Sequence, residues 1–444
     1  MQRLSEKVAN TATNGVKLAL ICCIFFWMTP LSARVSDDPV TKLAEDPRCG
    51  RALAWIDKNS AWVTDQQIRL TEIPAPEFGE ASRGAALEEL FAANSLEARV
   101  DKTGNVIGER PGSQKGTEAK SVILIAAHLD TVFPANTDVR VKRDGARLLA
   151  PGISDNGAGL AAIVGLARML SESRIRTEKT IVLAGDVGEE GEGNLRGIRA
   201  IIEEYGPRLA AVIAVDGPSA DHITTQGIAS RRIEVSVTGP GGHSWSDFGT
   251  PNPITAISRG IVRFSATSIP ESPRSTYNFG VIEGGTSVNS IPSRAAVKVD
   301  LRSENERELA RLESALREAM QTGVQEETRS STSQNGDYSA TDRGALNLEF
   351  RSLGTRPAGK LPDDSPLLAA IRSVDRYLGN SSRLEKSSTD ANLPLSLGIP
   401  AVAIGGGGHG GGSHTLDEWF EPTGREFGLK RLFLITLSLA GVQR

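Results

Sequence analysis

Four short apolar runs, each followed by a polar or glycine-rich turn, constrain the fold of this chain more than any other feature. They cover residues 122–127, 181–184, 210–215 and 401–404. Continuous apolar runs of this length are typical of strands that are buried on both faces of a sheet. Helical patterns separate them, for example at residues 160–170 and 195–205. This alternation of strands and helices predicts a layered α/β domain.

A second region has a different order of elements, namely strand, helix, strand, strand, helix and strand. These elements are predicted at residues 232–237, 254–264, 277–283, 295–302, 304–321 and 346–352. The β-α-β-β-α-β order packs two helices on one face of a four-stranded antiparallel sheet, as in ferredoxin-like domains. The polar stretch 326–341, between the last helix and the last strand, is predicted to be a mobile loop.

The length of 444 residues favours two domains, because a single compact core rarely grows to this size. The second region interrupts the α/β pattern, so the larger domain is predicted to be discontinuous. We predict a signal peptide at residues 1–33 and a catalytic domain formed by residues 45–230 and 358–444. Residues 231–357 are predicted to form the inserted domain.

The first 33 residues have the features of an export signal. Arg3, Lys7 and Lys17 precede an apolar stretch at residues 18–27, and a small-residue site follows at residues 31–33. We therefore predict export to a periplasm or beyond. The alternative is a retained membrane anchor, but the apolar stretch is shorter than the roughly 20 residues that a spanning helix needs. Cleavage would leave one cysteine, which cannot form an internal disulfide.

The charge distribution argues against a nucleic-acid partner. The formal net charge is only −4, and the 50 basic residues are scattered rather than gathered in a stripe. Binding to a phosphate backbone needs such a concentration of Lys and Arg. We therefore expect no nucleic-acid partner.

Histidines and acids follow the predicted buried segments. His128 and Asp130 follow the first run, Glu189 and Glu190 the second, Asp216 the third and His414 the fourth, while Asp155 lies in a glycine-flanked loop before a helix. Each has an ordinary alternative, such as a helix cap for Asp155 or a solvated loop for the glutamates. Their joint occurrence favours one site, because ligands gather at the carboxyl ends of strands in open α/β sheets.

The types of these residues indicate the chemistry. Two imidazoles and three carboxylates, without thiolates, suit a pair of zinc ions or similar cations. A two-metal site can hold a water as hydroxide and polarise a carbonyl at the same time.

Six motifs in a fixed order then resemble the M20 family of metallopeptidases. These are His128-Leu129-Asp130-Thr131, Ser154-Asp155-Asn156-Gly157-Ala158-Gly159, Gly188-Glu189-Glu190, Asp216, Gly242-His243-Ser244, and His414 through Glu418. The family includes carboxypeptidases, tripeptide aminopeptidases, dipeptidases and acylamino-acid deacylases. The resemblance runs from about Ala52 to the end of the chain, and it implies that the inserted domain is a dimerisation or lid domain.

The resemblance also implies roles for individual residues. His128 and Asp216 would bind one Zn²⁺, Glu190 and His414 the other, and Asp155 would bridge the two, with Co²⁺ or Mn²⁺ as alternatives. Asp130 would orient His128. Glu189 would be the general base that takes a proton from the metal-bridging water and delivers it to the leaving amine.

Residues of the inserted domain would complete the site. His243 would reach the active site of the partner subunit in a homodimer and stabilise the oxyanion. Asn289 and Arg302 would bind a carboxylate or carbonyl of the substrate, since the guanidinium matches a carboxylate. His222 and His409 match no ligand position and are interpreted as surface or loop residues.

Together these features predict an exported di-zinc metallopeptidase acting on the amide bonds of short peptides. Residues 188–197 are most similar to the tripeptidase-like branch of the family, which favours short substrates. One alternative is an N-acyl amino acid deacylase of the same fold. A non-catalytic metal-binding protein is a more remote alternative, because a pure binding site needs no general base at Glu189.

Overall fold

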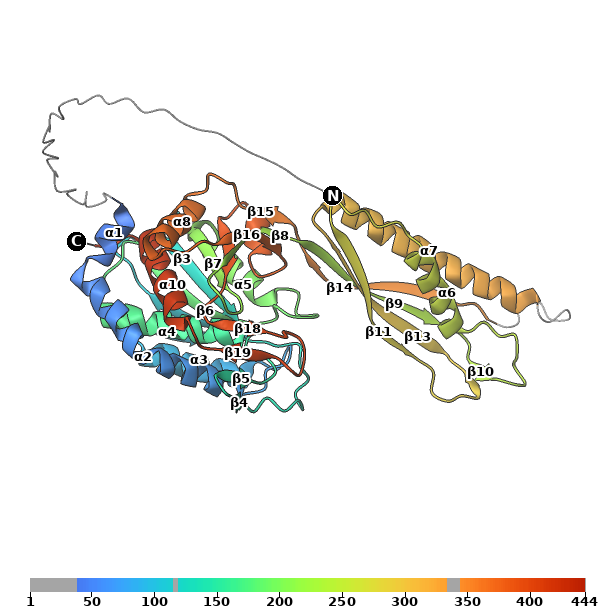
Figure 1. Cartoon of the computed structure of the whole chain (residues 1–444). Helices are drawn as coiled ribbons and strands as arrows, with labels where there is room; N and C mark the ends of the chain where they lie inside the picture. Colours follow the sequence, from blue (N-terminus) through green and yellow to red (C-terminus); the bar gives the residue numbers. More distant parts are fainter. Residues whose placement is uncertain (1–37, 115–118, 334–343, 444) are drawn as a thin grey trace, which may run out of the picture. The chain divides into compact units, whose positions relative to one another are not determined.

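The computed structural model describes residues 38–114, 119–333 and 344–443 (Figure 1). The predicted signal peptide lies outside these residues. Within the described ranges, no helix is long and apolar enough to cross a membrane.

The larger sheet has nine strands and contains all four predicted apolar runs. Its order is β1-β2-β6-β3-β7-β17-β8-β15, and β16 pairs with β8. The strands are β1 (Glu97–Val100), β2 (Val106–Arg110), β3 (Val122–His128), β6 (Thr180–Asp186), β7 (Leu209–Val215), β8 (His222–Gly227), β15 (Gly359–Lys360), β16 (Arg383–Ser387) and β17 (Ala401–Ile404).

The centre of this sheet sets the position of the site. Strands β6, β3, β7 and β17 are parallel neighbours, and nearly all of their residues are buried. The prediction of doubly buried strands is therefore confirmed. Because the four strands are parallel, the residues that follow them emerge at one edge of the sheet.

Helices cover this sheet, as the predicted layered α/β domain requires. Helix α4 (Gly157–Ser173) packs against β3, β6 and β7, and α2 (Pro47–Thr71) and α10 (Arg425–Ala440) pack against α4. The remaining helices of this part are α1 (Pro39–Ala44), α3 (Ala81–Ala93), α5 (Arg196–Tyr205), α8 (Pro366–Leu378) and α9 (Asn392–Ser396). The predicted helices at 160–170 and 195–205 correspond to α4 and α5.

The second sheet confirms the β-α-β-β-α-β order. Its strands β11 (Ser275–Gly284), β13 (Arg294–Ser303), β9 (Ala229–Thr238) and β14 (Asn347–Arg356) are antiparallel neighbours in this order. Alternate residues of β9, such as Ile233 and Val235, pack in one core with α6 (Pro253–Ser265) and α7 (Glu306–Ser333). The exact limits of the two domains stay a prediction.

Strand β14 is longer than the sequence pattern predicted. The expected strand ended at residue 352, but pairing with β9 continues to Arg356 across an irregularity between Ser352 and Gly354. A local bulge shifts the register without ending the strand. Strand β14 therefore continues past Gly354, and residues 353–356 bring Arg356 to the end of the sheet.

The loop predicted at residues 326–341 is wrong for its first part, because α7 continues to Ser333. Two glutamates of α7 contact α6 and the residue just before it. The side chain of Glu327 accepts the backbone N–H of Asn252 at 3.1 Å and lies 3.2 Å from Nε of Arg259, while Glu326 pairs with Arg263. These contacts between distant residues extend the helix through a polar sequence. Residues 334–343 lie outside the described ranges.

Two smaller sheets complete the fold, and the first of them lies beside the site. One has the order β18-β19-β5-β4 and joins β18 (His409–Gly411) and β19 (Trp419–Glu421) to β5 (Arg147–Leu149) and β4 (Lys142–Asp144). It holds the segment after His414 against the loop that contains Asp155. The other pairs β10 (Gly242–His243) with β12 (Ser290–Ile291).

Candidate active site

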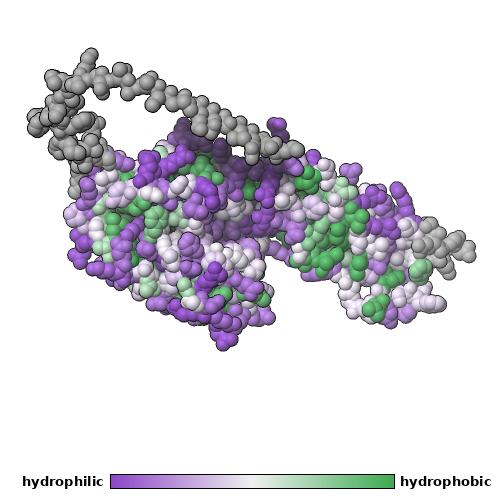
Figure 2. Space-filling view, in the orientation of Figure 1, coloured by the Kyte–Doolittle hydropathy of each residue, from purple (hydrophilic) through white to green (hydrophobic). Residues whose placement is uncertain are grey.

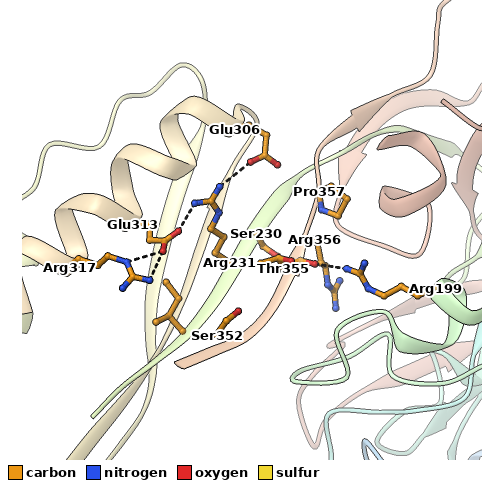
Figure 3. A pocket seen from close by; sticks show the side chains of 11 residues that line it. Arg199, Ser230, Arg231, Glu306, Glu313, Arg317, Ser352, Thr355, Arg356 and Pro357 are labelled. Atoms are coloured by element: carbon orange, nitrogen blue, oxygen red, sulfur yellow. Dashed lines mark hydrogen bonds and ion pairs between the residues drawn. The ribbon is translucent and has the colours of Figure 1, made fainter. Parts of the chain in front are cut away.

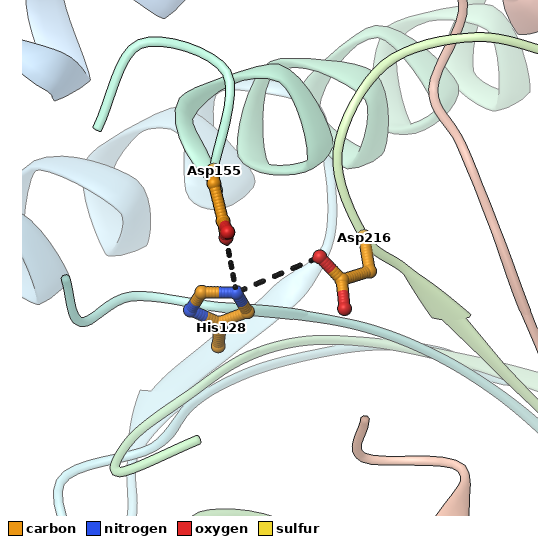
Figure 4. A group of neighbouring side chains, drawn as sticks. All are labelled: His128, Asp155 and Asp216. Atoms are coloured by element: carbon orange, nitrogen blue, oxygen red, sulfur yellow. Dashed lines mark ion pairs between the residues drawn. The ribbon is translucent and has the colours of Figure 1, made fainter. Parts of the chain in front are cut away.

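The structure brings all five predicted metal ligands together at the carboxyl edge of the large sheet. Their ligand atoms form overlapping groups in which all atoms lie within 4.8 Å of one another. One group is His128, Asp155 and Asp216, and another is Asp155, Glu190 and His414. Figure 4 shows the first group, with His128 at the end of β3 and Asp155 just before α4.

Asp155 is the residue that the two groups share. Its Oδ1 lies 3.2 Å from Nε2 of His128, and its Oδ2 lies 3.2 Å from Nε2 of His414. The other acids complete the arrangement: Oδ1 of Asp216 is 3.8 Å from His128 Nε2, and Oε1 of Glu190 is 2.9 Å from His414 Nε2. Each histidine thus faces one oxygen of Asp155 and one further carboxylate.

These residues fit divalent cations such as zinc. Oδ1 of Asp155 is buried and accepts no well-aligned hydrogen bond in the described part of the chain, although Nε2 of His128 lies 3.2 Å away. A buried carboxylate oxygen without a donor is costly unless a cation compensates it. Imidazole nitrogens and carboxylate oxygens are also the donors that zinc accepts in catalytic sites.

The electrostatics of the site favour positive charge at the histidines. Hydrogen bonds to Asp155 and Glu190 raise the pKa of His414 to about 10. Burial lowers the pKa of His128, but Asp155 and Asp216 outweigh it and raise the pKa above its usual value. In the metal-free protein, imidazolium rings therefore balance the acids. Metal binding requires neutral imidazoles and would release these protons.

Asp130 contacts His128 as expected, but through its backbone carbonyl rather than through its carboxylate. Nδ1 of His128 lies 3.0 Å from the backbone carbonyl oxygen of Asp130 and 3.8 Å from its carboxylate. The carboxylate instead accepts the backbone N–H groups of Glu189 at 3.1 Å and Glu190 at 2.8 Å. Asp130 therefore orients His128 through its main chain, and its side chain positions the loop that carries the two glutamates.

Glu189, the predicted general base, is buried beside an arginine that the sequence analysis missed. Its Oε1 lies 2.6 Å from a guanidinium nitrogen of Arg356, which also donates to the backbone carbonyl of Glu189. Burial raises the pKa of Glu189 to about 8, although Arg356 opposes this shift. A carboxyl group with a pKa near neutrality is suited to proton transfer.

Glu418 is a second residue whose role the sequence did not reveal. It is fully buried, and its carboxylate accepts the backbone N–H groups of Gly152, Ser154 and Asp155, each at 2.7 Å. Burial raises its pKa to about 7. The carboxylate thus holds the loop of Asp155 in place. Its position in the motif after His414 was the available signal.

Asn156 connects two of the ligand loops. Its side-chain oxygen accepts the backbone N–H groups of Gly159 and Gly217, both at 3.0 Å, and its amide donates to the carbonyl of Val215 at 2.9 Å. One side chain therefore caps α4 after Asp155 and also holds the turn that carries Asp216.

A cavity of about 340 Å³ opens beside these residues. The predicted substrate residue Arg302 lines it, together with Arg232, Arg356 and His222. His222, which we interpreted as a surface or loop residue, begins strand β8 and lines this cavity. His409, in β18, is exposed, as expected.

Neither His243 nor Asn289 lines this cavity. They come close to each other in the small sheet of β10 and β12. The backbone carbonyl of Asn289 accepts the N–H of Ser244 at 3.0 Å, and Nδ1 of His243 accepts the N–H of Trp245 at 3.1 Å. Within one chain, these two residues are thus not part of the site.

Comparison with known proteins gives consistent matches. The family model described as "Peptidase family M20/M25/M40" matches residues 124–436. The chain is 28% identical over 237 residues to carboxypeptidase G2 of Pseudomonas sp. (strain RS-16), covering 50% of the chain and 55% of that protein. It is 25% identical over 368 residues to the uncharacterized protein YqjE of Bacillus subtilis (strain 168), and the match covers 78% of this chain and 90% of that protein.

A solved structure shares the fold. The aminopeptidase PepT of Bacillus cereus ATCC 10987 superposes with a TM-score of 0.63 and 21% sequence identity. The match covers 86% of this chain and 99% of that one.

Proposed function

Because the chain belongs to the peptidase family M20/M25/M40, we propose that it is a di-zinc peptidase that hydrolyses the amide bonds of short peptides. Members of this family are metal-dependent hydrolases of amide bonds, usually with zinc, and this chain is such a hydrolase. One observation carries the proposal of two cations: the carboxylate of Asp155 presents a different oxygen to each of His128 and His414.

The ligands divide into two sets. His128 and Asp216 would hold one cation, Glu190 and His414 the other, and Asp155 would contact both. When bound, the cations would polarise the scissile carbonyl and lower the pKa of water. The protein holds these side chains through Asp130, Asn156 and Glu418, which bind the backbone of the ligand loops.

Glu189 is the proposed proton carrier. Its buried carboxylate takes a proton from the attacking water and passes it to the nitrogen of the leaving amine as the C–N bond breaks. The backbone hydrogen bond to Asp130 fixes the start of the loop, and Arg356 fixes the carboxylate itself. The raised pKa lets the group act as a base before attack and as an acid afterwards.

A second candidate is the deacylation of N-acyl amino acids. Three guanidinium groups line the cavity, and they would attract a substrate carboxylate but repel a free α-ammonium group. An acylated amino acid has the carboxylate without the ammonium. Of the predicted substrate residues, Arg302 lines the cavity and would bind this carboxylate.

A homodimer is proposed through the part of the chain that carries the second sheet. Figure 2 shows a hydrophobic surface over this part. Trp245 and Val288 are 87% and 104% exposed, and Phe248 is also exposed. The adjacent residues Ser244 and Asn289 are joined by a backbone hydrogen bond, so Trp245 and Val288 lie on neighbouring segments. Exposed apolar side chains grouped in this way are typical of protein interfaces. In the dimer, His243 and Asn289 would complete the site of the partner subunit.

The dimer has a direct test. Sedimentation velocity of the native protein should give one dimeric species, and the double variant Trp245→Ser with Val288→Ser should shift it to monomer. A control variant, Leu397→Ser, changes an exposed apolar residue outside this part of the chain and should stay dimeric. A monomeric native protein would end this proposal.

Export remains a proposal that rests on the basic and apolar pattern of residues 1–33. The test is N-terminal sequencing of the protein from the fractions of an expressing cell. A mature protein that starts after Ala33 outside the cytoplasm supports export. An intact N-terminus in the cytoplasm contradicts it.

The decisive experiment measures metal and activity together. We expect about two zinc ions per chain and hydrolysis of unblocked or N-blocked dipeptides. Chelation should remove the zinc and abolish hydrolysis, and added zinc should restore both the metal content and the activity. Asp155→Asn should reduce bound zinc below one per chain, whereas Asp221→Asn, which changes an exposed acid, should leave it unchanged. Full hydrolysis by a metal-free protein would refute the proposed function.

A further inference from the structure

Three arginines of the second sheet converge on the cavity from different strands. Arg232 lies on β9, Arg302 on β13 and Arg356 on β14, and all three line the cavity. Their register explains this convergence. Ser230 is paired with Arg302 on one side and with Arg356 on the other, and the neighbouring Arg232 is paired with Asp300. Residues directly opposite one another in an antiparallel sheet point to the same face.

The adjacent Arg231 marks the opposite face of the same strand. Figure 3 shows its side chain directed toward Glu306 and Glu313 of α7. Successive side chains of a strand alternate between faces. Arg232 therefore points away from the helices and toward the cavity.

The carboxylates around the cavity do not balance these arginines. Arg356 pairs with Glu189, and Nε of Arg302 lies 2.7 Å from Oδ2 of Asp300. The ion pair of Arg232 is with the same Asp300, at 3.8 Å from Oδ1, which is too long for a hydrogen bond. Two carboxylates thus serve three guanidinium groups.

The remaining acids of the cavity do not remove this excess. Glu385 also lines the cavity, but Arg383 lies 3.2 Å from its carboxylate. The other acids are the proposed metal ligands Asp155, Glu190 and Asp216, whose charges the cations would balance. Among the residues that line the cavity, one positive charge near Arg232 is therefore left without a matching anion.

Burial makes this excess charge costly. The side chain of Arg232 is only 14% exposed. Burial lowers the pKa of its guanidinium, and repulsion from Arg356 and Arg302 lowers it further, with only partial compensation by Asp300 and Glu189. A buried cation with too little counter-charge favours the binding of an anion.

We propose that Arg232 binds an acidic side chain of the substrate, so that the amino acid released as the amine is glutamate or aspartate. This inference rests on the proposed function, in which Arg302 binds the α-carboxylate of that amino acid. Arg302 and Arg232 share Asp300, so the two anions that they bind must be close together. The α-carboxylate and side-chain carboxylate of one acidic residue meet this requirement.

The test compares dipeptides that differ in one charge. With the zinc-loaded protein, kcat/KM for Ala-Glu should exceed that for Ala-Gln by about tenfold or more, as a charge pair in a partly buried site predicts. In Arg232→Gln this ratio should fall to about one. Arg232→Lys should restore part of the preference, because it keeps the charge.

Arg351→Gln is the matched control. Arg351 lies on β14 opposite Glu234, on the same face of the sheet, but it is 57% exposed and does not line the cavity. This variant should retain the native ratio. If Arg232→Gln does not fold, as judged by circular dichroism, the ratio in Arg232→Met, which also removes the charge, decides, and an unchanged ratio there overturns the inference.

The outcomes separate this inference from the proposed function. Hydrolysis without preference for Ala-Glu, or a preference that survives in Arg232→Gln, overturns the role of Arg232 and leaves the peptidase intact. If no peptide is cleaved, the proposed function fails. In that case the affinities for N-acetylglutamate and N-acetylglutamine, measured by calorimetry, decide about Arg232. Tighter binding of N-acetylglutamate that is lost in Arg232→Gln supports the anion site. Equal affinities of the native protein for the two ligands refute it.

Discussion

The guanidinium of Arg356 lies 2.6 Å from the carboxylate of Glu189, and both side chains are almost completely buried. The pair joins the end of strand β14 to the loop after strand β6. It therefore connects the second sheet to the group that we propose as the general base. Its consequences for catalysis and for stability can be measured separately.

Replacing Glu189 with Gln tests its role in proton transfer. The amide keeps the shape of the side chain and can still accept from Arg356, but it cannot carry the proton. We expect kcat to fall by roughly 10²- to 10⁴-fold, the usual contribution of a general acid-base group, with bound zinc unchanged. Steady-state kinetics and metal analysis on the same sample measure both quantities. Native activity in this variant would exclude the role.

Replacing Arg356 with Met tests the stabilising part of the pair. The variant leaves the Glu189 carboxylate buried without its partner, and breaking a buried pair in this way costs about 3–5 kcal/mol. We expect the free energy of unfolding to fall by an amount of this order, measured by urea denaturation at pH 9, where Glu189 is ionised. Arg351→Met, at the exposed site on the same strand, should cost less than about 0.5 kcal/mol. Equal losses in the two variants would contradict this account.

The metal-free protein should lose stability as the pH rises. The pKa values of Glu418, Glu189 and His414 are raised in the folded state to about 7, about 8 and about 10. The folded state therefore binds more protons than the unfolded state above the ordinary pKa of each group, and the slope of stability against pH is negative.

The pH window follows from these values. For the two glutamates the loss runs from their ordinary value of 4.5 to about 8, and for His414 from 6.5 to about 10. Thermal unfolding after chelation, measured between pH 5 and pH 10, should show a falling midpoint. Zinc should remove most of the trend above pH 7, because the cations replace the protons at the histidines. A midpoint that rises with pH would show that the signs are wrong.

Replacing Glu418 with Gln tests the support of the Asp155 loop. The two carboxylate oxygens accept hydrogen bonds from three backbone N–H groups, whereas the amide has only one acceptor oxygen. We expect zinc affinity to fall by about 10- to 100-fold, the usual effect of changing a residue that orients a ligand. Competition with a fluorescent chelator measures this affinity. Glu421→Gln, in the adjacent strand β19, is the control and should bind zinc normally.

Much of the fold and of the metal-binding set could be predicted from the sequence. Burial on both faces leaves a local record, because every residue of a central parallel strand must be apolar. The four runs therefore identified β3, β6, β7 and β17, and the residues that follow them included His128, Glu190, Asp216 and His414. The fold rule for strand ends then predicted that these distant residues meet.

The contacts that tune the site could not be predicted in this way. Glu189 and Arg356 are 167 positions apart, and the strand predicted from the sequence ended at residue 352, before Arg356. The register between β9, β13 and β14 places three arginines around one cavity, and nothing in the local pattern of each strand records its partners. Likewise, only the folded chain shows that Glu418 binds three N–H groups of the Asp155 loop. Local sequence determined which residues are buried, whereas register and packing between distant segments decided which charges meet.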